Sequence, residues 1–148
     1  MADNVSPDER RKIMASVHNK NTRPEVIVRK YLFAHGYRFR KNDSRYPGKP
    51  DIVLPRYHTM IFVHGCFWHR HPGCSKATMP TTNEEYWMNK FKRNIERDKL
   101  VQKQLSDLGW RVILVWECEI SSKKKRDMRL EKLLDEINAY DREYNFCK

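Results

Sequence analysis

Residues 91–120 read FKRNIERDKLVQKQLSDLGWRVILVWECEI and contain the two elements that decide the fold. From about residue 83, apolar residues recur at helical spacing, so we expect a long helix over 83–108. Its core-facing residues are expected to be Phe91, Ile95, Val101, Leu105 and Leu108. Gly109 should end this helix, and residues 110–116 (WRVILVW) are typical of a buried strand. A long helix followed at once by an apolar strand indicates an α/β protein.

The segments on either side extend this pattern. A helix is predicted over about 6–17, where Ser-Pro-Asp-Glu is typical of a helix start. A second helix is predicted to follow Thr22-Arg23-Pro24-Glu25, which repeats the capping-box spacing, and to end at Gly36. Strands are predicted over 37–40, 51–54 and 60–64, and an amphipathic helix over 122–148. The last helix would place four apolar residues on the core: Leu130, Leu133, Leu134 and Ile137. We therefore expect one domain over 1–148, with a mixed sheet centred on 51–54, 60–64 and 110–116 and flanked by helices.

The chain is strongly basic. Its 148 residues include 30 Lys and Arg against 19 Asp and Glu, a net charge of +11, and residues 1–50 alone carry 12 basic and 5 acidic side chains. Excess cations near one end point to a polyanion such as nucleic acid, and the alternative is a solvated basic surface. No apolar run is long enough to span a bilayer, and the first residues lack a signal peptide's apolar stretch. We expect a cytoplasmic protein with no membrane partner.

A group of cysteines and a histidine has the spacing of a zinc site. Its members are Cys66, His71, Cys74 and the more distant Cys118, which follows the 110–116 strand. Three thiolates and one imidazole form a standard tetrahedral set for structural zinc, which would hold a loop over 64–82. The alternative is three small buried cysteines and a surface histidine. Cys147 is expected to be a free spectator.

A second group of residues suggests acid–base chemistry. Asp51 opens a predicted strand after a Pro-Gly-Lys-Pro turn, where a carboxylate is placed to hold a hard cation such as Mg2+. Phosphodiester hydrolysis needs a metal, a base and support for the leaving oxygen, which Asp51, His69 and Glu25 could provide together, with His64 nearby. Taken singly, Asp51 could be a turn cap and Glu25 a capping-box residue.

Three motifs, GCFWHRHPGC (65–74), PGKPDIVL (47–54) and the 91–120 stretch, closely resemble the very short patch repair (Vsr) DNA mismatch endonucleases. The resemblance runs from about residue 8 to 120. It implies a restriction-endonuclease-like fold and a Mg2+-dependent cut of one strand, 5′ to the thymine of a T:G mismatch formed by deamination of 5-methylcytosine. It also implies a monomer acting in bacterial cytoplasm on the nucleoid, with functional links to a DNA cytosine methyltransferase and to mismatch-repair proteins.

The resemblance assigns roles by position. Asp51 would be the carboxylate ligand of Mg2+, and Val63 could contribute only its backbone carbonyl. His69 would be the general base or proton shuttle, His64 would support it, and Glu25 would hold water on the metal. Cys66, His71, Cys74 and Cys118 would bind structural zinc. The acidic-x-Lys triplet of the wider nuclease superfamily is replaced here by Val63-His64-Gly65, so histidines must take over the proton chemistry.

The same resemblance suggests how a mismatch is read. Phe67 and Trp68, where a core residue would be hard to bury, and Trp87 would enter the major groove. Met14 would enter the minor groove from a basic helix or arm over 1–20. Lys90, Arg93 and Asn94 are candidate phosphate or base-edge contacts. Without the resemblance, packing between helices is the simpler explanation for Trp87 and Met14.

Two other functions fit the sequence. One is a sequence-specific type II restriction endonuclease on the same fold, which would cut both strands of paired DNA. The other is a zinc-knuckle module that binds DNA without catalysis.

Overall fold

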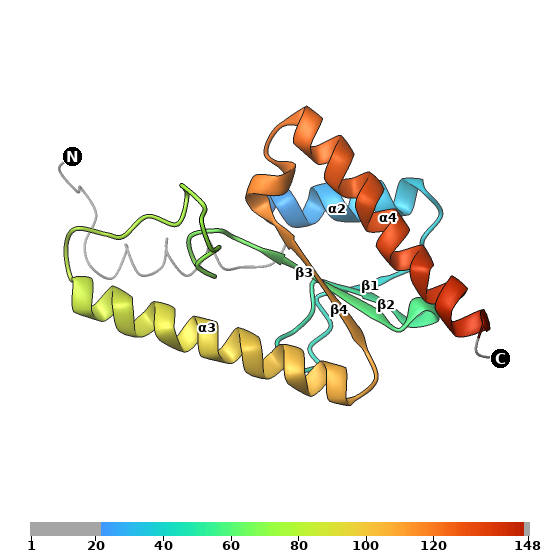
Figure 1. Ribbon diagram of the computed structural model, residues 1–148, viewed down its shortest axis with the longest axis horizontal. Helices are drawn as coiled ribbons and strands as arrows, with labels where there is room; N and C mark the ends of the chain where they lie inside the picture. Colours follow the sequence, from blue (N-terminus) through green and yellow to red (C-terminus); the bar gives the residue numbers. More distant parts are fainter. Residues whose placement is uncertain (1–21, 147–148) are drawn as a thin grey trace.

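The computed structural model describes residues 22–146, and side chains over 22–140. The elements in this range are α2 (Arg23–Ala34), β1 (Arg40–Lys41), β2 (Ile52–Leu54), η1 (Pro55–Tyr57), β3 (Thr59–His64), α3 (Glu84–Asp107), β4 (Arg111–Trp116), η2 (Glu117–Ile120) and α4 (Lys123–Phe146) (Figure 1). The helix predicted over 6–17, with Met14, and the spectator Cys147 lie outside the described residues. The long helix and the final helix are confirmed to within a residue or two.

The strands form one mixed sheet in the order β1-β2-β3-β4. β2 pairs antiparallel with both β1 and β3, whereas β3 and β4 are parallel. Parallel strands need a crossover, which α3 and the loop before it provide. The mixed sheet is confirmed. The expected central position of 110–116 is wrong, because β4 is the last strand of the described sheet.

Helices cover both faces of the sheet. α2 and α4 pack on one face and α3 on the other (Figure 1). Side chains alternate accordingly: Ile52, Leu54 and Ile61 belong to the core under α2 and α4, whereas Val53 and Met60 face Leu105 of α3. The structure is therefore a three-layer α/β domain, as expected.

Local details depart from the prediction at three places. Thr22 makes no side-chain cap, so the second capping box does not form, and Glu25 is buried instead. β1 begins at Arg40 rather than residue 37, because Tyr37 and Phe39 pack on the core from an irregular segment. Leu108 is 61% exposed, since the helix has ended and Gly109 turns the chain at φ +90°. None of the described helices has a stretch long and apolar enough to cross a membrane.

Candidate active site and metal centre

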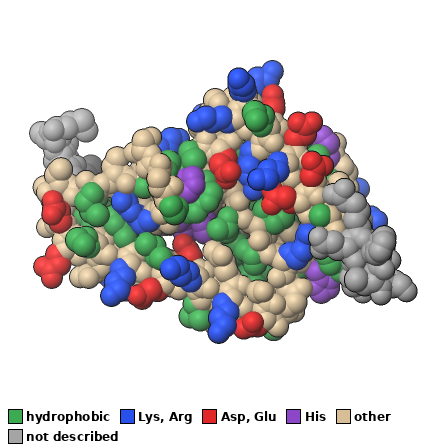
Figure 2. Space-filling view, in the orientation of Figure 1, with side chains coloured by type: hydrophobic (Ala, Val, Ile, Leu, Met, Phe, Trp, Pro, Cys, Tyr) green, Lys and Arg blue, Asp and Glu red, His purple; other side chains and the backbone are tan. Residues whose placement is uncertain are grey.

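A cleft of about 890 Å3 opens where α2, the start of β2, the end of β3 and α3 meet. It is lined by Glu25, Asp51, His64, His69 and Asp98, among others. Figure 2 shows histidine side chains in the middle of this face, with lysines and arginines around them. The fold thus brings together residues that are 73 positions apart in the sequence, including all four predicted for the chemistry.

Two carboxylates lie at the floor of this cleft. Asp51 Oδ2 accepts the backbone N–H of Val63 at 2.6 Å, and Glu25 lies beside it with Arg29 3.5 Å away. Burial, and then the neighbouring Glu25 charge, raise the pKa of Asp51 to about 8. Such a pair is stabilised by a divalent cation, and its oxygen donors suit Mg2+. The residues present therefore fit the metal that the resemblance implies.

The two histidines form a stacked pair. The rings of His64 and His69 are parallel to within 5° at a centroid distance of 3.8 Å. Burial, and then His69, lower the pKa of His64 to about 3, so this ring is neutral at pH 7. Within the described residues, the buried Nδ1 of His64 has no hydrogen-bond partner. One ligand atom from each of His64, His69 and Asp98 lies within 4.8 Å of the others, so this group could handle a proton or hold a metal ion.

Asp98 is a site residue that the sequence reasoning missed. Its Oδ2 lies 2.7 Å from His69 Nδ1. An ionised carboxylate can only accept, so Nδ1 carries the hydrogen and Nε2 is the acceptor nitrogen of the neutral ring. The available signal was spacing: Lys90, Asn94 and Asp98 are four residues apart and share one face of α3.

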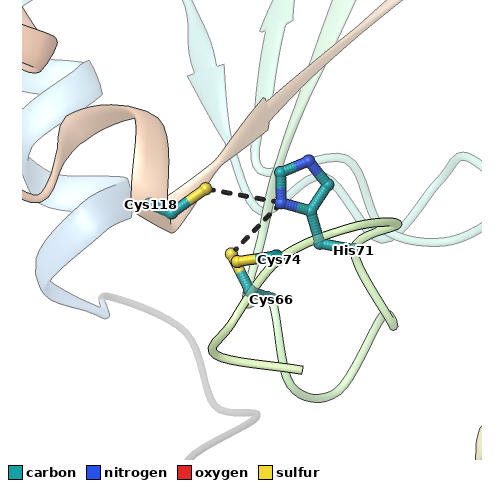
Figure 3. A group of neighbouring side chains, drawn as sticks. All are labelled: Cys66, His71, Cys74 and Cys118. Atoms are coloured by element: carbon teal, nitrogen blue, oxygen red, sulfur yellow. Dashed lines mark hydrogen bonds between the residues drawn. The ribbon is translucent and has the colours of Figure 1, made fainter. Parts of the chain in front are cut away.

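The predicted zinc ligands also come together (Figure 3). One ligand atom from each of Cys66, His71, Cys74 and Cys118 lies within 4.8 Å of all the others. His71 Nδ1 lies 3.6 Å from Cys66 Sγ and 3.3 Å from Cys118 Sγ. Burial raises the pKa of the Cys66 thiol to about 12, so a cation is needed to hold it as a thiolate. This donor set fits a tetrahedral metal.

A glutamate links the two sites. Glu117 Oε1 accepts the backbone N–H of Cys66 at 3.1 Å, and the same side chain lines the cleft. The loop that carries Cys66, His71 and Cys74 also carries His69, five residues before Cys74. The position of His69 in the cleft therefore depends on how the Cys and His ligands are held.

The aromatic residues predicted to contact DNA pack on one another at the mouth of the cleft. Phe67 lies 5.1 Å from Trp68 and 5.8 Å from Trp87, between ring centroids, and Phe91 joins the group. Trp68 is buried, contrary to the expectation that a residue there would be hard to bury. Asn94 donates its amide to Trp68 O at 3.1 Å, which holds this cluster on α3.

Cationic side chains line the cleft from two sides. Lys49 comes from the loop before β2, and Lys90 and Arg97 come from α3. Arg97 was not predicted, whereas the predicted Arg93 lies outside the cleft lining and bonds only weakly to Asn89 O, at 3.4 Å. Of the described cations, Lys90 and Arg97 on α3 are therefore better placed than Arg93 to meet a phosphate inside the cleft.

Paired carboxylates, an oriented histidine and cations in one cleft of a basic protein define an endonuclease. Residues 2–76 match the family model described as DNA mismatch endonuclease Vsr. A type II nicking enzyme of Neisseria meningitidis is 47% identical over 93% of this chain and 97% of its own length. The DNA mismatch endonuclease Vsr of Escherichia coli is 39% identical over 92% of this chain and 87% of its own. A type II nicking enzyme of Xanthomonas oryzae is 45% identical over 91% and 98%. The chain belongs to the Vsr family.

Proposed function

We propose that this protein nicks one strand of duplex DNA 5′ to the thymine of a T:G mismatch and so begins repair of deaminated 5-methylcytosine. The observation that carries the nuclease chemistry is the cleft in which Asp51, Glu25 and the His64–His69–Asp98 group meet. Family membership and a relative named as a mismatch endonuclease support the mismatch substrate.

Asp51 is the proposed protein ligand of Mg2+, the Val63 carbonyl is the second candidate donor, and Glu25 would hold water on the metal. When bound, Mg2+ would neutralise charge on the scissile phosphate and polarise it. Lys90 and Arg97 would hold the flanking phosphates in the cleft. These groups would position the strand to be cut between the carboxylates and His69.

His69 is the proposed general base or proton shuttle. Asp98 holds Nδ1, which directs Nε2 toward the substrate, and the neutral His64 ring stacked on it limits rotation. The geometry resembles a carboxylate–histidine pair in which the acid sets tautomer and orientation. Asp98 is therefore a positioning residue and His69 the catalytic one.

Zn2+ is the proposed metal of the Cys66, His71, Cys74 and Cys118 cluster. Residues 72–82 include no buried residue, so the loop has little core of its own. A structural metal supplies folding free energy where apolar burial does not. The aromatic cluster of Phe67, Trp68 and Trp87 is the proposed wedge at the mismatch, and residues 1–20 the proposed arm on the opposite side.

The test uses matched end-labelled duplexes that contain T:G, T:A or C:G at one position. With Mg2+ present, we expect one nick, in the thymine strand of the T:G duplex alone. Cleavage of both strands of the paired duplexes would instead identify a restriction endonuclease. Binding without any nicking, in protein that holds its metals, would identify a DNA-binding module.

A further inference from the structure

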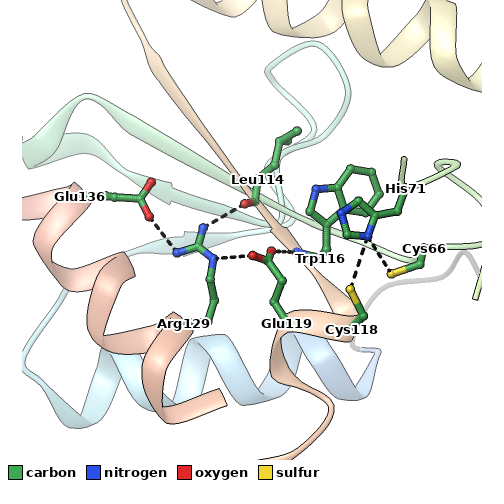
Figure 4. A network of polar contacts seen from close by, with 8 residues as sticks. All are labelled: Cys66, His71, Leu114, Trp116, Cys118, Glu119, Arg129 and Glu136. Carbon is green, nitrogen blue, oxygen red and sulfur yellow. Dashed lines mark hydrogen bonds and ion pairs between the residues drawn. The ribbon is translucent and has the colours of Figure 1, made fainter. Parts of the chain in front are cut away.

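A buried arginine joins the C-terminal helix to the turn that carries Cys118 (Figure 4). Arg129 of α4 donates to Leu114 O at 3.0 Å, and its Nε lies 3.3 Å from Glu119 Oε2. The same guanidinium lies 2.8 Å from Glu136 Oε1. Only 10% of the Arg129 side chain is exposed, whereas Glu119 and Glu136 are 33% and 35% exposed.

Glu119 connects Arg129 to the backbone of β4. Its second oxygen, Oε1, accepts the N–H of Trp116 at 2.7 Å. Since β4 is the last strand of the described sheet, its outer backbone groups have no strand to bind. Arg129 and Glu119 meet two of them, at Leu114 and Trp116, and so tie the end of β4 to α4.

The turn held in this way carries one zinc ligand and supports another. Cys118 lies in η2 between Glu117, which bonds to the Cys66 backbone, and Glu119. The Trp116 ring stacks on His71 with centroids 4.1 Å apart and planes within 11°. A four-residue 3-10 turn has weak internal hydrogen bonds, so side-chain contacts must set its position. The first turn of α4, which follows, has no acidic residue to stabilise it.

We infer that Arg129 is a positioning residue for the metal centre, which it controls through Glu119, the η2 turn and Cys118. This inference rests on the proposed zinc site. Partners of this kind orient metal ligands, and their loss lowers metal affinity by about 10- to 100-fold. The C-terminal helix thus contributes to holding the metal although it supplies no ligand among its described side chains.

The chain offers a matched control in Arg111. This arginine also joins β4 to α4, through the carbonyls of Glu136 and Ile137, and it donates to Thr59 Oγ1 of β3. It lies at the start of β4, away from the metal ligands at the other end of the strand. Arg111→Met therefore removes a similar set of contacts without touching η2.

The experiment compares zinc release from the full chain to a chromogenic chelator, followed by absorbance, in wild type, Arg129→Met, Arg129→Lys, Glu119→Gln and Arg111→Met. We expect release about 10- to 100-fold faster in Arg129→Met and a smaller increase in Glu119→Gln. Arg129→Lys should resemble Arg129→Met, because an ammonium cannot make the forked contacts. Arg111→Met should match the wild-type rate even if its Tm falls.

A second readout separates positioning from general loosening. In cobalt-substituted protein, the ligand-field bands should move in Arg129→Met and stay in place in Arg111→Met. Equal release rates and equal spectra for the two arginine variants would overturn the inference. Wild-type protein that binds no zinc would overturn the proposed metal centre itself. If Arg129→Met does not fold, Glu119→Gln is compared with Arg111→Met in its place.

Discussion

The metal cluster and the cleft lie side by side but are built differently. In the cluster, four soft donors face one another, and their ligand atoms converge within 4.8 Å. In the cleft, oxygen and nitrogen donors are held by the protein: Asp51 by Val63 N–H and His69 by Asp98. The first arrangement would use all four ligands on one ion, whereas the second lines an open cleft with carboxylate oxygens and ring nitrogens.

The difference assigns separate roles to neighbouring residues of one loop. Cys66, His71 and Cys74 would stabilise the loop, whereas His69, between them in the sequence, faces the cleft. Variants in the cleft should therefore abolish nicking and leave folding intact. Variants in the cluster should act primarily by lowering the stability of the fold. The four predictions below test this division, from the largest expected effect to the smallest.

Asp51→Asn should lower the nicking rate most, by roughly 10³-fold or more, because it removes the charge that holds the metal at the phosphate. The free energy of unfolding should stay the same or rise, since the substitution also removes repulsion between Asp51 and the buried Glu25. Single-turnover nicking and thermal denaturation measure the two effects. Nicking at the wild-type rate would show that Asp51 is not part of the active site. A lower unfolding temperature would contradict the proposed division of roles between the cleft and the cluster.

Cys118→Ser should act mainly on stability. Loss of one thiolate should release the zinc and lower the free energy of unfolding by several kcal/mol, a fall in Tm of roughly 10 °C. Metal analysis of the purified variant and calorimetry check both parts. Cys74→Ser, a change to another ligand of the same cluster, is the matched control and should give the same result. A Tm equal to that of wild type would show that the cluster does not stabilise the fold.

How well the sequence predicted these two regions depends on how local each one is. Three of the four cluster residues lie within nine positions, so ligand spacing was enough to group them. Asp98 pairs with His69 across 29 positions and became visible only once α3 was placed beside the loop. The spacing of Lys90, Asn94 and Asp98 could have placed Asp98 on the cleft face of α3, but nothing in the local sequence marks its pairing with His69.

The errors in the predicted fold have a similar cause. The pattern at Thr22 and Glu25 correctly predicted the start of a helix. The capping box itself does not form, because Glu25 is buried at the cleft by tertiary packing. Apolar alternation over 37–40 could not show that Tyr37 and Phe39 pack on α2 and α4 from outside the sheet. The position of β4 at the end of the sheet depends on strand order, which its apolar sequence does not determine.

Asp98→Asn tests the orientation of the base within the cleft. It should lower kcat by about 10- to 100-fold with KM unchanged, because an oriented general base contributes up to roughly 10⁴-fold and only part of that is lost. His69→Ala should lower kcat further. Steady-state kinetics on the T:G duplex separate the two variants. A rise in KM alone would place Asp98 in substrate binding rather than in positioning His69.

The smallest expected effect concerns two arginines one turn apart on α3. Both arginines are exposed, but Arg97 lines the cleft and donates to Asn94 Oδ1 at 3.0 Å, whereas Arg93 lies outside the cleft lining. In an Asp51→Asn background, which prevents cleavage, Arg97→Met should weaken DNA binding a few-fold and reduce the slope of log K against log salt by about one. Arg93→Met should change neither the affinity nor the slope.

Fluorescence anisotropy over a range of salt concentrations measures both slopes, and Arg97→Lys, which keeps the charge, should retain the wild-type slope. Equal slopes for Arg97→Met and Arg93→Met would mean that DNA follows the outer face of α3, and that the cleft receives only the strand that is cut.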